Sequence, residues 1–161
     1  MKNIHILTGE IKSGKTTRLM LWASSQKNID GILQPVIEGK RFIYHIGSKT
    51  LKQLEIADEP NAIQIGNYKF SGTVFSWSQN VILSCFQKHL DWLVIDEIGP
   101  LELEGKGLEP AISEIFKQVN NLNGNVLCVV RNSILEEFIK HYNLQFKFQL
   151  FDFPLKNLEH D

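Results

Sequence analysis

The feature that most constrains this chain is a glycine-rich segment near its start, Gly9-Glu10-Ile11-Lys12-Ser13-Gly14-Lys15-Thr16. The segment matches the phosphate-loop pattern Gly-x-x-x-x-Gly-Lys-Ser/Thr. The apolar run Asn3–Leu7 precedes it, and the stretch Lys15–Ser25, which contains no helix breaker, follows it. A buried strand, a glycine-rich turn and a helix are therefore expected in this order, as in α/β proteins. The alternative, a glycine-containing turn beside a surface lysine, would not require these flanking elements.

Each fixed position of this segment has a physical reason. Gly9 and Gly14 permit backbone angles that other residues avoid, so consecutive N–H groups can turn inward around an anion. Lys15 brings a positive charge to the β- and γ-phosphates, and the hydroxyl of Thr16 is placed to ligate Mg²⁺. The chain is therefore predicted to bind a nucleoside triphosphate, with Mg²⁺ as its cofactor. The predicted nucleotide-binding residues are Gly9, Glu10, Ile11, Lys12, Ser13, Gly14, Lys15, Thr16 and Thr17.

A pair of acidic residues forms the second motif. The uninterrupted apolar run Trp92–Ile95 is typical of a central parallel strand covered on both faces, and it ends in Asp96 and Glu97. Asp96 is expected to be the second anchor for Mg²⁺, through water, because this ion keeps most of its hydration shell. Glu97 is expected to orient and polarise the attacking water. Taken alone, the pair would fit a strand end that faces solvent, and the phosphate loop upstream favours the catalytic interpretation.

Two polar residues follow the apolar run Val126–Val130. Arg131 and Asn132 would lie at the edge of the sheet where open α/β sheets bind ligands. Either is a candidate sensor of the γ-phosphate, and Arg131 is counted among the catalytic residues with Glu97 and Lys15. The structural alternative is that Asn132 caps a helix and Arg131 is solvated.

Four further charged residues are candidates for the same site. Lys40 and Arg41 lie in a predicted hairpin and would supply a cation to the triphosphate, although charged residues in turns are usually solvated. Glu102 and Glu104 lie in the glycine-containing loop that follows the acidic pair. They would approach the site if this loop folds back on it.

The remaining pattern alternates between strands and helices, which predicts a parallel sheet with helices on both faces. Helices are predicted at 15–25, 78–90, 109–122 and 133–142, the last with a Ser-x-x-Glu capping box that starts at Ser133. Strands are predicted at 3–7, 92–95, 125–130 and 146–151. An antiparallel hairpin extension is expected around residues 31–75, with arms at 32–37 and 41–46, a strand at 51–56 and a strand at 63–70.

Bulk properties exclude several classes of protein. The chain has 161 residues, so one domain covering residues 1–161 is expected. A net charge of -1 provides no basic field for nucleic acid, and no segment reaches the roughly 18 apolar residues of a membrane span. Cys85 and Cys128 lack metal-ligand spacing and lie in apolar runs, so reduced buried thiols are favoured over a disulfide. A cytoplasmic location is the default expectation.

The segment Asp96–Leu103, read as Asp-Glu-Ile-Gly-Pro-Leu-Glu-Leu, resembles the Asp-Glu-Ile-Gly-x-Met-Glu-Leu signature of a known family. These are the small nucleoside-triphosphatases first described from thermophiles, which are P-loop proteins with a RecA/AAA-like core. The resemblance spans most of the chain. It implies Mg²⁺-dependent hydrolysis of ATP, GTP and other nucleoside triphosphates, carried by Lys15, Thr16, Asp96 and Glu97, and it supports a role for Glu102.

The chain departs from the family pattern in the predicted hairpin. Where the family has a Thr-x-Glu-Val-Arg-like stretch, this chain has Gln34-Pro35-Val36-Ile37-Glu38. The family's Gly-x-Arg-x-Gly-Phe run is represented only by Gly39-Lys40-Arg41-Phe42, and Pro100 replaces a residue that is often basic. Contacts with partners or with the rest of the substrate are therefore expected to differ.

Three functions fit these residues. The favoured one is a nucleoside-triphosphatase with broad base tolerance, because the guanine motif Asn-Lys-x-Asp is absent from the sequence. The second is a small kinase, which would need an acceptor pocket and an arginine-rich lid that only Lys40-Arg41 would begin. The third is a nucleotide-dependent switch with slow turnover, for which Asp96 would suffice but Glu97 would not be needed. No protein partner is indicated.

Overall fold

The structure is a computed structural model that describes residues 3–9, 14–56 and 58–154. Eight strands form the main sheet: β1 (Ile4–Gly9), β2 (Ile29–Leu33), β3 (Val36–Ile37), β4 (Lys40–His45), β5 (Thr50–Gln53), β8 (Trp92–Ile98), β9 (Asn125–Arg131) and β10 (Phe148–Leu150). Their order is β10-β1-β9-β8-β2-β4-β3, with β5 also paired to β4. Two further strands, β6 (Ile63–Ile65) and β7 (Tyr68–Phe70), form a separate hairpin.

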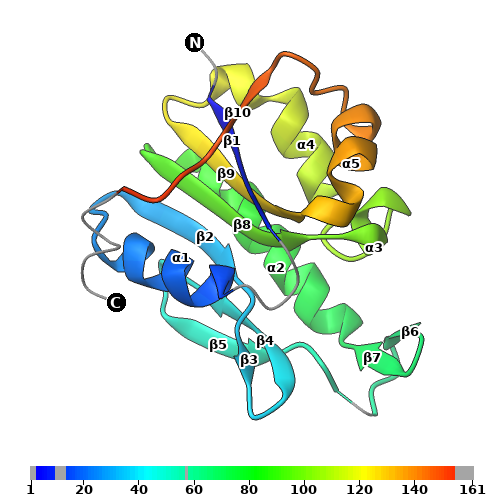
Figure 1. Cartoon of the computed structure of the whole chain (residues 1–161). Helices are drawn as coiled ribbons and strands as arrows, with labels where there is room; N and C mark the ends of the chain where they lie inside the picture. The colour runs from blue at the N-terminus through cyan, green and yellow to red at the C-terminus, as the bar shows by residue number, and fades with distance from the viewer. Residues whose placement is uncertain (1–2, 10–13, 57, 155–161) are drawn as a thin grey trace.

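The strand directions confirm the predicted fold class. The pairs β10–β1, β1–β9, β9–β8 and β8–β2 are parallel, whereas β4 pairs antiparallel with β2, β3 and β5. The protein is therefore an α/β protein whose mostly parallel sheet carries an antiparallel extension. Because neighbouring parallel strands run in the same direction, the carboxyl ends of β1, β2, β8 and β9 lie along one edge of the sheet (Figure 1).

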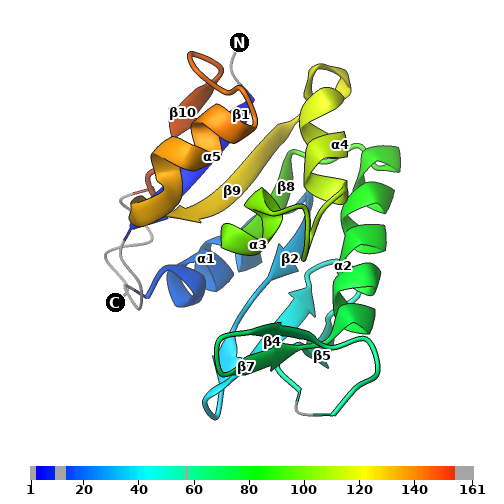
Figure 2. The ribbon, with the colours of Figure 1, turned by 90° about the vertical axis from the view of Figure 1, so that its right-hand side faces the viewer.

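Helices cover both faces of the sheet. The α-helices are α1 (Lys15–Ser24), α2 (Gly72–Ser84), α3 (Pro100–Leu103), α4 (Ala111–Lys117) and α5 (Leu135–His141), and the 3₁₀ turns are η1 (Cys85–Gln87), η2 (Val119–Asn121) and η3 (Asn132–Ile134). Figure 2 shows α1 on one side of the sheet and α2 and α4 on the other. Among the described residues, no helix is long and apolar enough to cross a membrane.

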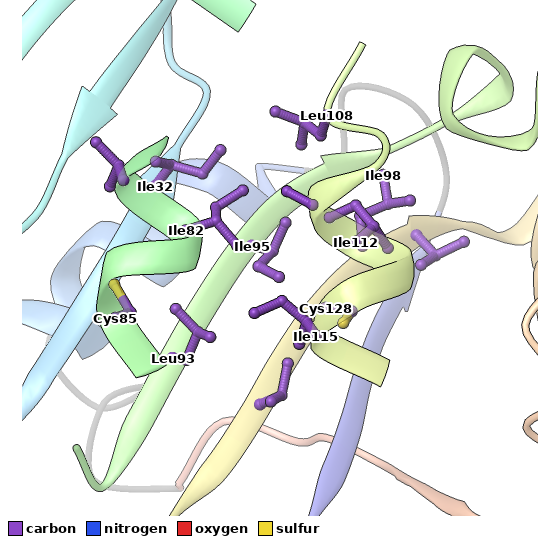
Figure 3. Packing of buried hydrophobic residues seen from close by; sticks show 14 of the residues in the cluster. Ile32, Ile82, Cys85, Leu93, Ile95, Ile98, Leu108, Ile112, Ile115 and Cys128 are labelled. Atoms are coloured by element: carbon purple, nitrogen blue, oxygen red, sulfur yellow. The ribbon is translucent and has the colours of Figure 1, made fainter. Parts of the chain in front are cut away.

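The apolar run of β8 is buried on both of these faces. Leu93 and Ile95 belong to the core beneath α2, α4 and α5, while Val94 belongs to the core beneath α1. Figure 3 shows Ile95 between Ile82 of α2 and Ile112 of α4, and Leu93 near Cys85. Successive residues of a strand point to opposite faces, so a strand covered on both sides needs an apolar residue at every position.

Both cysteines are buried and unbonded to each other. Cys85 is the first residue of η1, directly after α2, and Cys128 lies in the middle of β9. Both side chains pack in the core on the side of α2 and α4 (Figure 3). The prediction of reduced buried thiols is confirmed.

The start of the second helix was predicted wrongly. The helix expected at 78–90 begins at Gly72, where the hydroxyl of Ser71 accepts a hydrogen bond from the N–H of Val74 at 3.0 Å. The strand expected at 63–70 is instead the β6–β7 hairpin. Aromatic and β-branched residues are frequent from Tyr68 to Trp77, so the local pattern favours strand, whereas the Ser71 cap and packing against the sheet select helix.

The antiparallel hairpin expected from the arms 32–37 and 41–46 is confirmed. Ile32 and Leu33 pair antiparallel with β4, as do Val36 and Ile37, and Ile32 also pairs in parallel with Ile95 of β8. Pro35 lies between the two paired parts and has no N–H for a ladder bond. The capping box expected at Ser133, in contrast, is not formed, since α5 begins after η3 and has no side-chain cap.

A buried carboxylate ties the antiparallel extension to the parallel sheet. Asp30, in β2, is 2% exposed and binds the ammonium group of Lys88. It also accepts hydrogen bonds from the N–H groups of Gly31 at 2.7 Å and Gly47 at 2.9 Å, and its Oδ1 lies 2.9 Å from Nε2 of His45. Burial raises the pKa of Asp30, but the Lys88 bond, the two N–H groups and the charge of His45 outweigh it, and the pKa is lowered overall.

We expect Asp30→Asn to lower the free energy of unfolding by about 2 kcal/mol at pH 7, because Lys88 and His45 lose their anionic partner while the amide retains one acceptor. Since the folded pKa of Asp30 lies below its unfolded value, its stabilisation is present above about pH 4 and is lost as the pH falls through the folded pKa. Urea unfolding should therefore separate the two proteins at pH 7 and bring them together in acid. Asp152→Asn, at an exposed position, is the matched control; an equally large loss there would contradict a specific role for Asp30.

Candidate functional site

The predicted site residues converge at the carboxyl edge of the parallel strands. Gly9, the last residue of β1, pairs with Arg131, the last residue of β9. β8 lies on the other side of β9 and carries Asp96 and Glu97 near its end. Segments that are far apart in the sequence are thus joined by strand pairing alone, and this edge is where open α/β sheets bind ligands.

The described part of the phosphate loop has the expected geometry. Gly14 has φ 77°, in the left-handed region, and α1 begins at the next residue, Lys15. A Cβ at Gly14 would meet no atom within 4 Å, so the backbone angle, and not lack of space, is what favours glycine here. Thr16 and Thr17 lie in the first turn of α1. The predicted contacts of Glu10, Ile11, Lys12 and Ser13 with phosphate lie outside the described residues.

The first direct link across the site joins the two motifs. The hydroxyl of Thr16 donates a hydrogen bond to Oδ2 of Asp96 at 3.0 Å. The same oxygen accepts the N–H of Gln34 at 2.9 Å, whereas Oδ1 of Asp96 is buried without a hydrogen-bond partner among the described residues. Full burial raises the pKa of Asp96 to about 6, with the neighbouring Glu97 adding to the effect and the Gln34 and Thr16 bonds opposing it.

These atoms fit a magnesium ion. Mg²⁺ prefers oxygen ligands and usually binds one or two protein oxygens together with phosphate and water. A hydroxyl next to a buried carboxylate with one unbonded oxygen supplies that donor set, and a cation would relieve the burial of the Asp96 charge. Across residues 3–9, 14–56 and 58–154, no group of three or more His, Cys, Asp or Glu side chains could hold a metal.

Glu97, the second-last residue of β8, has an unusual backbone conformation. Its φ is 58°, a left-handed value for a residue other than glycine. The ladder between β8 and β9 shifts here, because Ile95 pairs with Cys128 while Ile98 pairs with Val130, leaving one extra residue in β8. Such a conformation costs on the order of 1–3 kcal/mol and persists where the surroundings enforce it, often at functional sites. Because of the bulge, the Glu97 side chain does not follow the regular alternation of side chains between the two faces of the sheet. It is 21% exposed.

Two arginines face the Glu97 carboxylate. Nε of Arg131 lies 3.7 Å from Oε2 of Glu97, and Nη1 of Arg41 lies 3.8 Å from the same oxygen. Arg131 ends β9 and Arg41 lies in β4, so three strands contribute to this charge cluster. Both arginines were candidates from the sequence, and the structure places both beside Glu97. Two guanidinium groups at the edge of a phosphate loop form an anion-binding surface.

Three of the other sequence candidates are engaged elsewhere. Asn132 accepts a hydrogen bond from the hydroxyl of Thr8 at 2.7 Å, so it joins β1 to η3 and does not cap α5. The ammonium group of Lys40 is exposed and lies 3.5 Å from a carboxylate oxygen of Glu55. Glu104 is exposed and lies 3.8 Å from Lys106.

Glu102 stabilises the loop that contains it. Its side chain, 3% exposed, accepts hydrogen bonds from the N–H of Gly99 at 2.7 Å and from the N–H of Leu108 at 3.0 Å. Burial is the main cause that raises its pKa to about 7, with the two N–H groups opposing it. These bonds close the loop between α3 and α4 around one carboxyl group. The expectation that Glu102 approaches the acidic pair is thus replaced by a structural role.

Gln34 is the residue of the site that the sequence did not single out. It was noted only as part of a departure from the family pattern, yet it contacts Asp96 twice, through its N–H and through its side-chain amide. One signal was available. A polar residue that follows an apolar strand and precedes Pro35 is held extended at a strand end, where the carboxyl edge of the sheet begins.

Comparisons with known proteins identify the family and the fold. A family model described as NTPase matches residues 4–160. The crystal structure of THEP1 from the hyperthermophile Aquifex aeolicus superposes with a TM-score of 0.73 at 18% identity, covering 97% of this chain and 92% of that one. The solution structure of a human cancer-related nucleoside triphosphatase gives a TM-score of 0.66 at 20% identity, covering 98% of this chain and 92% of that one. At these identities the two structures establish the fold. No curated protein sequence matches the chain.

Proposed function

The chain belongs to the NTPase family and is a nucleoside-triphosphatase, and we propose that its reaction is Mg²⁺-dependent hydrolysis of nucleoside triphosphates to diphosphate and phosphate. The family assignment confirms the resemblance expected from Asp96–Leu103. The observation that carries the finer proposal is the 3.0 Å hydrogen bond from Thr16 to Asp96, next to a Glu97 carboxylate that two arginines face.

Each group has a separate task in the proposed reaction. The loop Gly9–Thr17 holds the triphosphate, and the Lys15 ammonium group offsets charge on its β- and γ-phosphates. Thr16 and Asp96 would hold Mg²⁺, which when bound neutralises part of the phosphate charge. Catalysis of phosphoryl transfer is mostly positioning and charge stabilisation, so few groups are needed beyond these.

Glu97 and Arg131 both act at the γ-phosphate. Glu97 accepts a hydrogen bond from the attacking water, orients it toward the γ-phosphorus and takes up its proton as the phosphorus–oxygen bond forms. The bond to the β-phosphate oxygen breaks, and the diphosphate leaves with the electron pair. Arg131 is proposed to bind the γ-phosphate oxygens, on which negative charge is spread in the transition state. Its 3.7 Å separation from Glu97 supports a position at the same reacting group.

The base of the nucleotide is proposed to contribute little to recognition. The proposed contacts concern phosphate and metal oxygens, which all nucleoside triphosphates share. We therefore expect broad base tolerance, with ATP and GTP both accepted.

Phosphate release tests this proposal directly. The protein is incubated with ATP, GTP, CTP or UTP in the presence of Mg²⁺ or of excess EDTA, without any acceptor. We expect release with every nucleotide in Mg²⁺ and none in EDTA, because the ion joins the triphosphate to Asp96. Lys15→Ala, purified in the same way, controls for contaminating phosphatases. Release no greater than that of this variant would sink the hydrolase, and transfer to an added metabolite in place of release would favour a kinase.

A further inference from the structure

Gln34 is a buried amide that the proposed reaction does not use. It follows β2 directly and is 5% exposed. Its backbone N–H donates to Oδ2 of Asp96 at 2.9 Å, and its side-chain Nε2 donates to the backbone oxygen of Asp96, also at 2.9 Å. One residue of the neighbouring strand therefore binds both the carboxylate and the main chain of Asp96.

The main-chain bond acts on the peptide group that precedes Glu97. Peptide groups are planar, so fixing the direction of the Asp96 carbonyl also fixes the N–H of Glu97 and constrains where its Cα lies. This peptide lies within the bulge of β8, and Glu97 itself has φ 58°. A bulge disrupts the regular ladder, and a carbonyl that loses its ladder bond in a buried position needs another donor. The side-chain amide of Gln34 is that donor.

Gln34 also connects the bulge to the hairpin that carries Arg41. Pro35 follows it, and the carbonyl of Pro35 accepts the N–H of Phe42 at 2.8 Å. Arg41, the neighbour of Phe42, reaches Oε2 of Glu97 at 3.8 Å. Residues 34–35 therefore link Asp96, which precedes Glu97 in the chain, to the strand that carries Arg41, which faces the Glu97 carboxylate.

We infer that Gln34 is a positioning residue whose side-chain amide holds the Asp96–Glu97 bulge and so sets the direction of the Glu97 carboxylate. The inference rests on the proposed role of Glu97 in hydrolysis. Gln34 acts through Glu97 and has no contact of its own with the reacting atoms in this assignment.

Gln34→Leu is the first test, since leucine is similar in length and has no donor. We expect kcat to fall by roughly 10- to 100-fold, as for a catalytic group displaced by about 1 Å. Triphosphate affinity measured in EDTA with a fluorescent nucleotide should change by less than about threefold, because the phosphate loop belongs to β1 and α1. Gln53→Leu is the matched control. Gln53 also donates its amide to a backbone carbonyl, that of Glu55 at 2.7 Å, but lies on the exposed strand β5; its kcat should match wild type.

A pH profile separates positioning from general damage. In Gln34→Glu, the protonated side chain can donate to the Asp96 carbonyl, whereas the ionised one cannot and repels the nearby Asp96 and Glu97 carboxylates. The ratio of its kcat to that of wild type should therefore rise as the pH falls from about 8 to about 6. The same ratio for Gln34→Leu should stay constant. A flat ratio for Gln34→Glu would overturn the inference, and this variant also serves if Gln34→Leu does not fold.

The outcomes distinguish this inference from the proposed function. Wild-type kcat in Gln34→Leu, or a parallel loss of kcat and of metal-free nucleotide binding, overturns the positioning role. If wild type shows no hydrolysis, the proposed function fails, and a double-mutant cycle in the free energy of unfolding becomes the readout. Because the amide of Gln34 holds the peptide that precedes Glu97, the effects of Gln34→Leu and Glu97→Gln should not add, whereas those of Gln53→Leu and Glu97→Gln should; additive effects for the first pair would overturn the inference independently.

Discussion

Glu97→Gln should lower kcat by about 10³-fold while leaving triphosphate affinity within about threefold of wild type. The amide keeps the size of the side chain and can still contact water, but it cannot accept a proton from it. It also removes the negative charge that lies 3.7 Å from Arg131 and 3.8 Å from Arg41. Neither arginine would then be held by Glu97, so binding of the anionic γ-phosphate should be maintained or strengthened.

The measurement pairs single-turnover hydrolysis with nucleotide binding in the same buffer. Glu104→Gln is the matched control, since this glutamate lies in the loop after the acidic pair and its carboxylate is exposed. We expect the control to hydrolyse at the wild-type rate. If Glu97→Gln also hydrolyses at that rate, Glu97 is not the base, and the water must be oriented by another group of the site.

Asp96→Asn should abolish most Mg²⁺-dependent turnover, by about 10²-fold or more, and at the same time stabilise the ligand-free protein. The fully buried carboxylate has a pKa of about 6 in the folded state against 3.8 for its ordinary value. A raised carboxyl pKa means that the folded state resists the charge. Above about pH 6 this costs the fold up to about 3 kcal/mol, since each pKa unit corresponds to about 1.4 kcal/mol.

The pH dependence follows from the same shift. As the pH falls from about 6 toward about 4, Asp96 takes up its proton in the folded state first, so this contribution stabilises wild type. Asp96→Asn carries no charge and lacks this dependence. In urea unfolding without metal or nucleotide, the free energy of unfolding of Asp96→Asn should therefore exceed that of wild type by about 2 kcal/mol at pH 8. This difference should vanish near about pH 4. At limiting Mg²⁺, wild-type turnover should fall as the pH drops through about 6, because protons then compete with the cation for the Asp96 carboxylate.

A matched control checks the assignment to burial. Asp91→Asn, at an exposed position just before β8, should change neither stability nor turnover. A loss of stability in Asp96→Asn at pH 8 would contradict the prediction. It would mean that the bonds from Thr16 and Gln34 stabilise the ionised form by more than burial costs it.

The opposition between stability and catalysis at Asp96 has a structural cause. The Oδ1 of Asp96, which has no hydrogen-bond partner in the described part of the chain, and the buried charge are unfavourable in the ligand-free protein, and a bound cation would relieve both. Glu97 adds a second unfavourable feature, its left-handed backbone angle. The surrounding β ladders, buried on both faces, keep these two residues in place.

Several features of this protein are determined by its sequence alone. The glycines and Lys15-Thr16 of the loop act through local backbone angles and helix geometry, so their pattern is visible in a short segment. The apolar run that ends in Asp96 and Glu97 predicts a central parallel strand, and parallel strands bring their carboxyl ends together. The α/β fold, the meeting of the two motifs and the reduced cysteines follow from these local signals.

Only the tertiary structure decided how the site is completed. Arg41 and Arg131 meet at Glu97 because β4 and β9 lie on either side of β8 at a particular register, and no local pattern encodes such a register. Gln34 binds Asp96 because Pro35 ends the strand and a bulge turns a carbonyl toward it. The position of Glu102 in the signature suggested a role in the site. Its carboxyl group instead accepts hydrogen bonds from two N–H groups of its own loop. Long-range pairing and the need to satisfy buried polar groups set these contacts, and both depend on residues distant in the chain.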